Sequence, residues 1–79
     1  MKNRTDSRPL LDWLLSRGAL TLSIKLRREG NRYQVSIDRG GADEHLHVTR
    51  VGAGRKAFQL HAEWVAAFRD AGWTSVAYR

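Results

Sequence analysis

LTLSIKLRREGNRYQVSID, residues 20–38, contains two runs in which apolar and polar residues alternate. This period of two is typical of strands that have one buried face. The Gly30-Asn31 pair between the runs suits a two-residue hairpin turn. With that turn the apolar residues of both runs share one face. The expected pairs are Leu26 with Val35 and Ile24 with Ile37. The stretch therefore predicts an antiparallel hairpin.

The segments that follow the hairpin predict further elements. After a turn at Gly40-Gly41, residues 45–49 predict a third strand, with Leu46 and Val48 inward and the histidines outward. An apolar stripe then predicts a helix from about Lys56 to Ala71. Residues 73–79 alternate again and predict a final strand.

The N-terminal segment predicts another helix. Ser7 is a good N-cap, and Pro9 is tolerated in a first turn. Four leucines recur at helical spacing before Gly18: Leu10, Leu11, Leu14 and Leu15. Residues 1–6 are polar and predict a flexible N-terminus.

The expected fold class is therefore α+β, with residues 7–79 as a single domain in the order α-β-β-β-α and a final β. We expect a two-layer sandwich, in which both helices pack on one face of an antiparallel sheet. The other face should be open to water. It would carry these residues: Ser23, Lys25, Arg27, Glu29, Arg32, Gln34, Ser36 and Asp38. Because no aromatic lies among them, the face does not suit base stacking.

Composition limits the classes of function. The 79-residue chain has no cysteine, which excludes disulfides and thiolate zinc sites and favours a cytoplasmic protein. No stretch reaches the roughly 20 apolar residues of a membrane span, so a membrane partner is not expected. So short a chain has little room for a deep reaction cleft. We expect neither an enzyme nor a cofactor.

The basic residues suggest the partner. A formal net charge of +6 favours polyanions or acidic protein surfaces. The abundance of arginine also fits a GC-rich genome. The candidate binding residues are Arg50, Arg55 and Lys56, followed by Lys25, Arg27 and Arg32. Trp73 is a candidate hydrophobic anchor, since Trp and Arg dominate binding hot spots.

Two smaller features have alternative interpretations. The glycine loop at residues 52–56 precedes a helix start and suits either a phosphate or an ordinary turn. His45 and His47 are two apart, so they fit either exposed strand residues or two ligands of a metal. The candidate third ligands are Asp43, Glu44 and His61.

Two resemblances extend this interpretation. Gly54-Arg55-Lys56-Ala57 enters an alanine-bearing helix (Ala62, Ala66, Ala67), and with the expected α-β-β-β-α order the chain resembles a double-stranded RNA-binding domain. That likeness implies that Arg55 and Lys56 contact phosphates across the major groove.

The chain is also similar to phage-encoded anti-CRISPR inhibitors. The shared features are its short length, the absence of cysteine and of a catalytic set, and the arginines at positions 27, 32, 50 and 55. This likeness implies that the protein docks on a nucleic-acid-handling protein complex of a host cell and inhibits it sterically. The alternative is direct binding of duplex RNA or DNA through the same residues.

Overall fold

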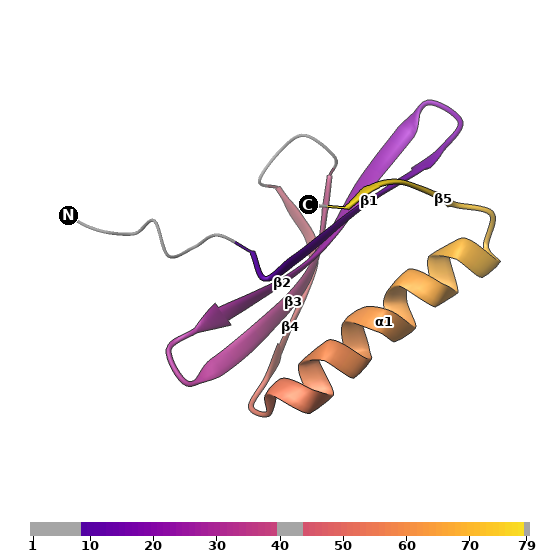
Figure 1. The fold of residues 1–79 in the computed structure, drawn as a ribbon. Helices are drawn as coiled ribbons and strands as arrows, with labels where there is room; N and C mark the ends of the chain where they lie inside the picture. Colours follow the sequence, from indigo (N-terminus) through magenta and orange to yellow (C-terminus); the bar gives the residue numbers. More distant parts are fainter. Residues whose placement is uncertain (1–8, 40–43, 79) are drawn as a thin grey trace.

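The computed structural model describes residues 9–39 and 44–78 of the chain (Figure 1). These residues form an antiparallel sheet in the order β4-β3-β2-β1-β5 and one helix, α1. The elements are β1 (Leu11–Arg17), β2 (Leu20–Glu29), β3 (Arg32–Arg39), β4 (His45–Val51), α1 (Gly54–Asp70) and β5 (Thr74–Tyr78). The expected flexible segment 1–6, the cap Ser7, the turn at Gly40-Gly41 and the ligand Asp43 lie outside the described residues.

The predicted N-terminal helix is wrong, because β1 occupies that segment. Its leucines fit a helical stripe, yet Leu11, Trp13 and Leu15 also alternate. In the structure these three oppose apolar residues of β2: Leu26, Ile24 and Leu22. Gly18 adopts a φ of 61°, which suits the first central position of a two-residue hairpin turn. Pairing along β2 therefore overrides the local helical spacing, and the order becomes β-β-β-β-α-β.

The predicted hairpin of β2 and β3 is confirmed. Leu26 opposes Val35 and Ile24 opposes Ile37 across the Gly30-Asn31 turn. The helix predicted near residues 56–71 is confirmed as α1, and the final strand is confirmed as β5, which pairs with β1.

The predicted inward face of β4 is wrong. His47 opposes Ile37 and faces the helix, whereas Leu46 is 50% exposed. Val51 opposes Tyr33 on the side of the sheet that faces α1, so Thr49 and His47, at alternate positions, face α1 as well. A register shift between Ile37 and Asp38 then reverses the alternation near His45.

The core lies between α1 and the sheet. Its buried apolar residues are Leu15, Ile24 and Val65 in one cluster, and Leu26, Val35 and Ala57 in another. α1 packs mainly against β2, β3 and β4, so the described elements cover the β1 side of this face only in part (Figure 1). A single helix therefore replaces the expected pair. No helix in the described ranges is long and apolar enough to cross a membrane.

We predict that truncating Leu15 and its neighbour Leu14 has unequal effects on stability. Leu15 is fully buried against Ile24 and Val65, so Leu15→Ala should cost about 2–5 kcal/mol of unfolding free energy. Leu14 is only partly buried and lies on the other face, so Leu14→Ala should cost about 1 kcal/mol. Urea denaturation measures both. Equal losses would indicate a helical stripe at this segment instead of a strand.

Candidate functional site

Basic residues gather where the β2–β3 turn and the β4–α1 loop lie at the same end of the molecule (Figure 1). Gln34 links two of them, since it opposes Arg27 on β2 and Arg50 on β4. A Cβ on Gly54 would lie 3.1 Å from the Tyr33 ring, so the helix start contacts the hairpin directly. We call this region the cationic end. Its residues are Arg27, Arg28, Arg32, Arg50, Arg55 and Lys56.

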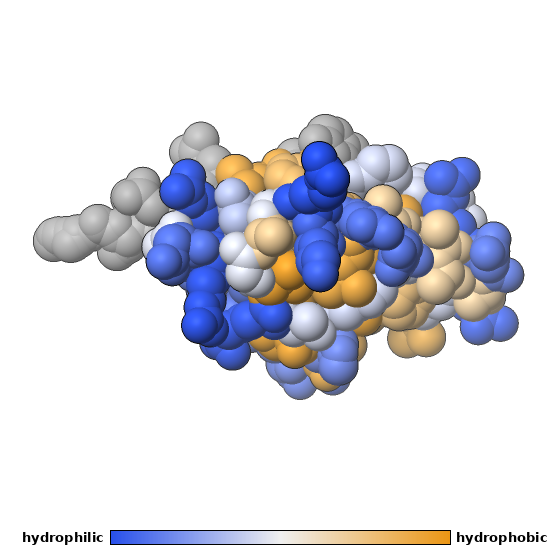
Figure 2. Space-filling model, turned by 90° about the horizontal axis from the view of Figure 1, so that it is seen from below, coloured by the Kyte–Doolittle hydropathy of each residue, from blue (hydrophilic) through white to orange (hydrophobic). Residues whose placement is uncertain are grey.

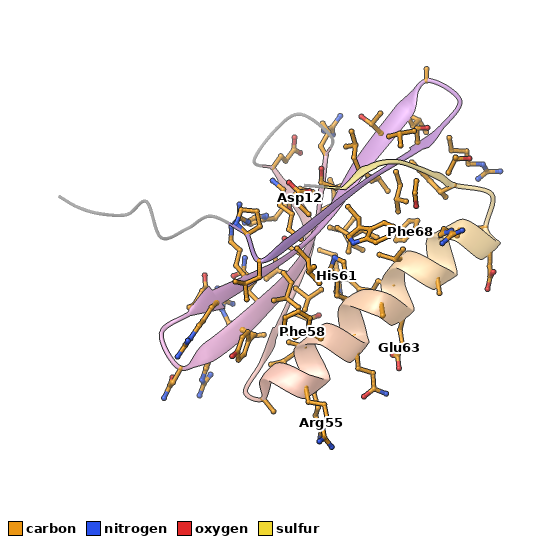
Figure 3. All side chains as sticks on the ribbon, in the orientation of Figure 1. Asp12, Arg55, Phe58, His61, Glu63 and Phe68 are labelled. Atoms are coloured by element: carbon orange, nitrogen blue, oxygen red, sulfur yellow. The ribbon has the colours of Figure 1, made fainter. Side chains whose placement is uncertain are left out.

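The cationic end has two faces. Arg27, Arg32 and Arg50 lie on the sheet face opposite α1, whereas Arg55 and Lys56 lie in the first turn of α1. Arg55 points away from the sheet (Figure 3). Two acidic residues of the described chain adjoin this end: Glu63 lines the same shallow pocket as Lys56, and the Glu29 carboxylate lies 3.6 Å from Nε of Arg50. Because the Arg50–Glu29 pair is exposed, its two side chains attract each other only weakly. The cationic end therefore keeps a net positive charge that a partner can meet.

The start of α1 adds to this positive character. Its N-cap residue, Ala53, makes no side-chain hydrogen bond, and no acidic residue lies in the first turn. The positive end of the helix dipole therefore stands beside Arg55 and Lys56 without a neutralising carboxylate from that turn. The predicted glycine loop thus forms an electropositive helix start.

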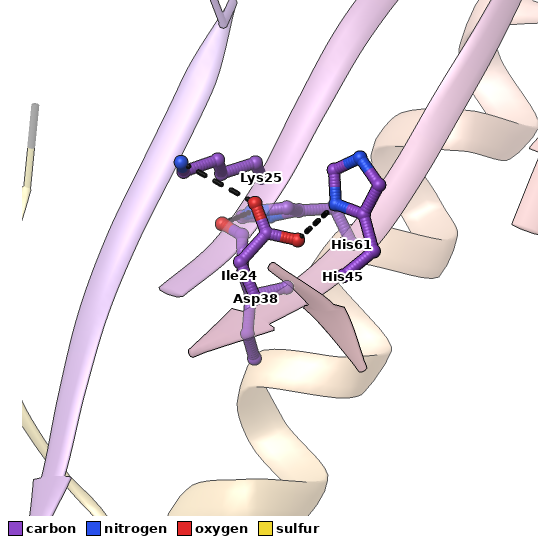
Figure 4. A network of polar contacts seen from close by, with 5 residues as sticks. All are labelled: Ile24, Lys25, Asp38, His45 and His61. Carbon is purple, nitrogen blue, oxygen red and sulfur yellow. Dashed lines mark hydrogen bonds and ion pairs between the residues drawn. The ribbon is translucent and has the colours of Figure 1, made fainter. Parts of the chain in front are cut away.

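The structure places Lys25 away from the cationic end. Its Nζ lies 3.3 Å from Oδ2 of Asp38, and Nδ1 of His45 lies 2.6 Å from Oδ1 of the same carboxylate (Figure 4). Asp38 is 0% exposed and Lys25 is nearly buried. Of the six predicted binding residues, Lys25 is therefore the one that the fold places in a buried ionic cluster.

The sheet face that was expected to be open to water is largely buried. Its buried residues are Ser23, Lys25, Gln34, Ser36 and Asp38. The expectation of an open face was therefore wrong, and at Asp38 the cover comes from Lys25 and His45, which converge on its carboxylate from neighbouring strands. Among the described residues, Oδ2 of Asp38 makes the ion pair with Lys25 but accepts no hydrogen bond.

The two strand histidines do not lie on one outward face, as the alternation predicted. The register shift beside Ile37 puts His45 on the Asp38 side and His47 on the helix side, where its ring lies 5.3 Å from that of Trp64. Within residues 9–39 and 44–78, no group of three His, Cys, Asp or Glu side chains is placed to hold a metal ion. The HxH spacing therefore reflects a bulged strand, with one ring on each face.

His61 is buried between α1 and the sheet and points toward the sheet (Figure 3). Its Nε2 donates a hydrogen bond of 2.8 Å to the Ile24 carbonyl oxygen. Burial lowers the pKa of His61 below the ordinary 6.5, although the bond to Ile24 and the charge of Asp12 act in the opposite direction. The side chain is thus held neutral in the core.

The predicted anchor Trp73 packs edge-on against Phe68, with ring centroids 5.7 Å apart, and is partly buried. Sequence reasoning missed a second apolar surface, a groove of about 700 Å³ between α1 and β1. The groove is lined by Leu11, Trp13, Phe58, His61, Ala62, Val65, Ala66 and Arg69. Figure 2 shows apolar surface on this side of the molecule between hydrophilic side chains. The spacing of Phe58, Ala62 and Ala66 was the signal available in the sequence.

Comparisons of the chain with protein-family models, with curated proteins and with solved structures find no match. We therefore infer function from the geometry of the chain itself.

We predict that two neighbouring ionic residues of β3 differ strongly in their effect on stability. Asp38→Ala removes a fully buried carboxylate that pairs with both Lys25 and His45, and should cost about 3–5 kcal/mol of unfolding free energy. Arg39→Ala removes only an exposed ion pair of 3.1 Å with Glu44, and should cost less than about 1 kcal/mol. Chemical denaturation measures both. Similar costs would show that the Asp38 cluster is not buried as described.

We predict that His61 makes stability fall in mild acid. Its folded-state pKa lies below that of the unfolded chain, so the unfolded state binds the extra proton first. The contribution is complete above the ordinary value of 6.5 and is lost as the pH falls below it, by at most about 1.4 kcal/mol per pH unit. Denaturation at pH 7.5 and pH 5 should show a smaller acid loss for His61→Gln than for wild type. The same loss in both proteins would contradict the assignment.

Proposed function

We propose that the protein is a small non-enzymatic inhibitor that works by binding. Its cationic end docks on an acidic surface of a nucleic-acid-handling protein complex and blocks that surface sterically. The observation that carries the proposal is the concentration of six basic residues at one end, which the carboxylates of Glu29 and Glu63 adjoin in the described part of the chain. Arginine forks there suit carboxylates and phosphates alike. This mode of action resembles that of anti-CRISPR proteins, and we place it in the cytoplasm of a host cell.

The buried ionisable groups are engaged in contacts within the fold, and this supports a binding function over a catalytic one. Asp38 is engaged by Lys25 and His45, and His61 donates to a backbone carbonyl. Each of these groups already has a structural partner, whereas a general acid or base must reach a substrate. Arg28, Arg32, Arg50 and Arg55 of the cationic end, in contrast, are exposed, so a macromolecule can reach them.

The apolar groove favours a protein over a bare duplex. A duplex is held mainly by cations on its phosphates, whereas protein interfaces combine charge with a desolvated apolar core. The likeness to a double-stranded RNA-binding domain also loses its first helix, which is β1 here. Direct duplex binding stays the second candidate, because the start of α1 presents Arg55 and Lys56 without an acidic neighbour in that turn.

We predict that reversing one charge at either end of β3 distinguishes a specific effect of the cationic end from a general effect of net charge. Arg32 begins the strand at the cationic end, and Arg39 ends it at the other; both are exposed. Arg32→Glu should weaken capture of the partner complex from nuclease-treated lysate of the source cells by about tenfold or more. Arg39→Glu, which changes the net charge equally, should weaken it less than about twofold.

Two results would overturn the proposal. Equal capture by Arg32→Glu and wild type would remove the cationic end from the interface. Capture that disappears after nuclease treatment, together with binding to a plain duplex that falls steeply as salt rises, would establish the second candidate instead.

A further inference from the structure

The groove between α1 and β1 is an apolar surface that the described part of the fold leaves uncovered. Leu11 and Trp13 contribute from the sheet, while Phe58, which is 45% exposed, contributes from the helix. Ala62 and Ala66 follow along α1 and are also exposed. Their short side chains leave room for another element to approach the backbone of α1 closely.

Basic residues stand at both ends of this groove. At one end Arg69 lines it, and Nε of Arg17 reaches to 3.7 Å from the Cβ position of Gly72, just beyond α1. Beyond the other end, Arg55 lies about one turn before Phe58 on α1 and Arg28 ends the helix-facing side of β2, although neither lines the groove itself. Among the described residues, no acidic side chain lines the groove.

We propose that this groove binds an amphipathic helix of another protein, whose apolar face is flanked by acidic residues at its ends. A helix laid beside α1 would bury Trp13, Phe58 and the alanine row, in the manner of helix-in-groove recognition. α1 has 17 residues and is about 25 Å long, so the arginines at its ends are spaced to meet carboxylates about four turns apart.

Charge and shape favour this occupant over others. A second copy of the chain would bring a like arginine rim and a net charge of +6, so repulsion opposes self-association. Small molecules are held in clefts that enclose most of their surface, whereas this groove is partly open to the surface. Arg28 and Arg55 belong to the cationic end, but no residue of that end lines the groove itself. Arg32 lies on the sheet face opposite α1, so a variant at Arg32 separates this inference from the proposed function.

The test uses a synthetic peptide as probe. It has about 16 residues, with leucines at i, i+3, i+4 and i+7 and glutamates at both ends. A control peptide has the same leucines and lysines in place of the glutamates. Fluorescence anisotropy should show saturable binding of the glutamate peptide and binding at least tenfold weaker of the lysine peptide. Equal affinity of the two peptides, or no saturable binding of the first, would overturn the proposal.

Two matched variants locate the bound peptide. Ala62→Gln places a larger side chain inside the groove and should weaken binding by about tenfold or more. Ala67→Gln makes the same change at an exposed position of α1 that does not line the groove, and should change affinity less than about twofold. If the two variants bind alike, the peptide does not occupy the groove.

Two further measurements exclude the remaining outcomes. Arg32→Glu should bind the peptide with less than about threefold loss; a larger loss would place the peptide at the cationic end, which would overturn this inference but leave the proposed function intact. Sedimentation should give a monomer. A dimer that Ala62→Gln dissociates would show that a second copy fills the groove, and would overturn the choice of occupant.

Discussion

One helix has to cover the apolar face of a five-stranded sheet in the described chain, and this mismatch of width shapes the molecule. Five strands span about 19 Å at about 4.8 Å between neighbours, whereas a helix with its side chains is about 10–12 Å wide. α1 packs mainly over β2, β3 and β4, so Leu11 and Trp13 on β1 line an open groove. The exposed apolar groove therefore exists because residues Leu11–Arg17 form a strand that α1 does not fully cover.

The opposite face of the sheet is organised by charge. Lys25 and His45 both contact the fully buried Asp38, so the positive charge of Lys25 is engaged within the fold. Such a cluster contributes more to a unique arrangement of the strands than to net stability, because the desolvation of its charges is costly. Six other basic residues lie near the β2–β3 turn and the start of α1: Arg27, Arg28, Arg32, Arg50, Arg55 and Lys56. Exposed positive charge and exposed apolar surface thus adjoin each other, a combination typical of protein-binding domains.

How much the sequence predicts depends on how many local signals agree. The β2–β3 hairpin was predicted with its register, because alternation and the Gly30-Asn31 turn indicate the same structure. β1 was not, because its leucines fit either period and the choice is made by pairing with β2. The face of β4 was misjudged because the shift beside Asp38 reverses the alternation. In the candidate site, five of the six predicted basic residues lie at the cationic end. The groove was not predicted, because it depends on how α1 packs on the sheet and no single segment of the sequence indicates that.

The conformation of residues 10–17 tests the account most directly, and nuclear magnetic resonance can determine it in solution. The account predicts extended backbone chemical shifts there, with cross-strand nuclear Overhauser effects that link Leu11 to Leu26 and Trp13 to Ile24. It also predicts contacts from the Trp13 indole to Val65 across the groove. Helical shifts with i to i+3 contacts between Leu11 and Leu14 would contradict it, because a second helix would then cover the face on which the groove depends.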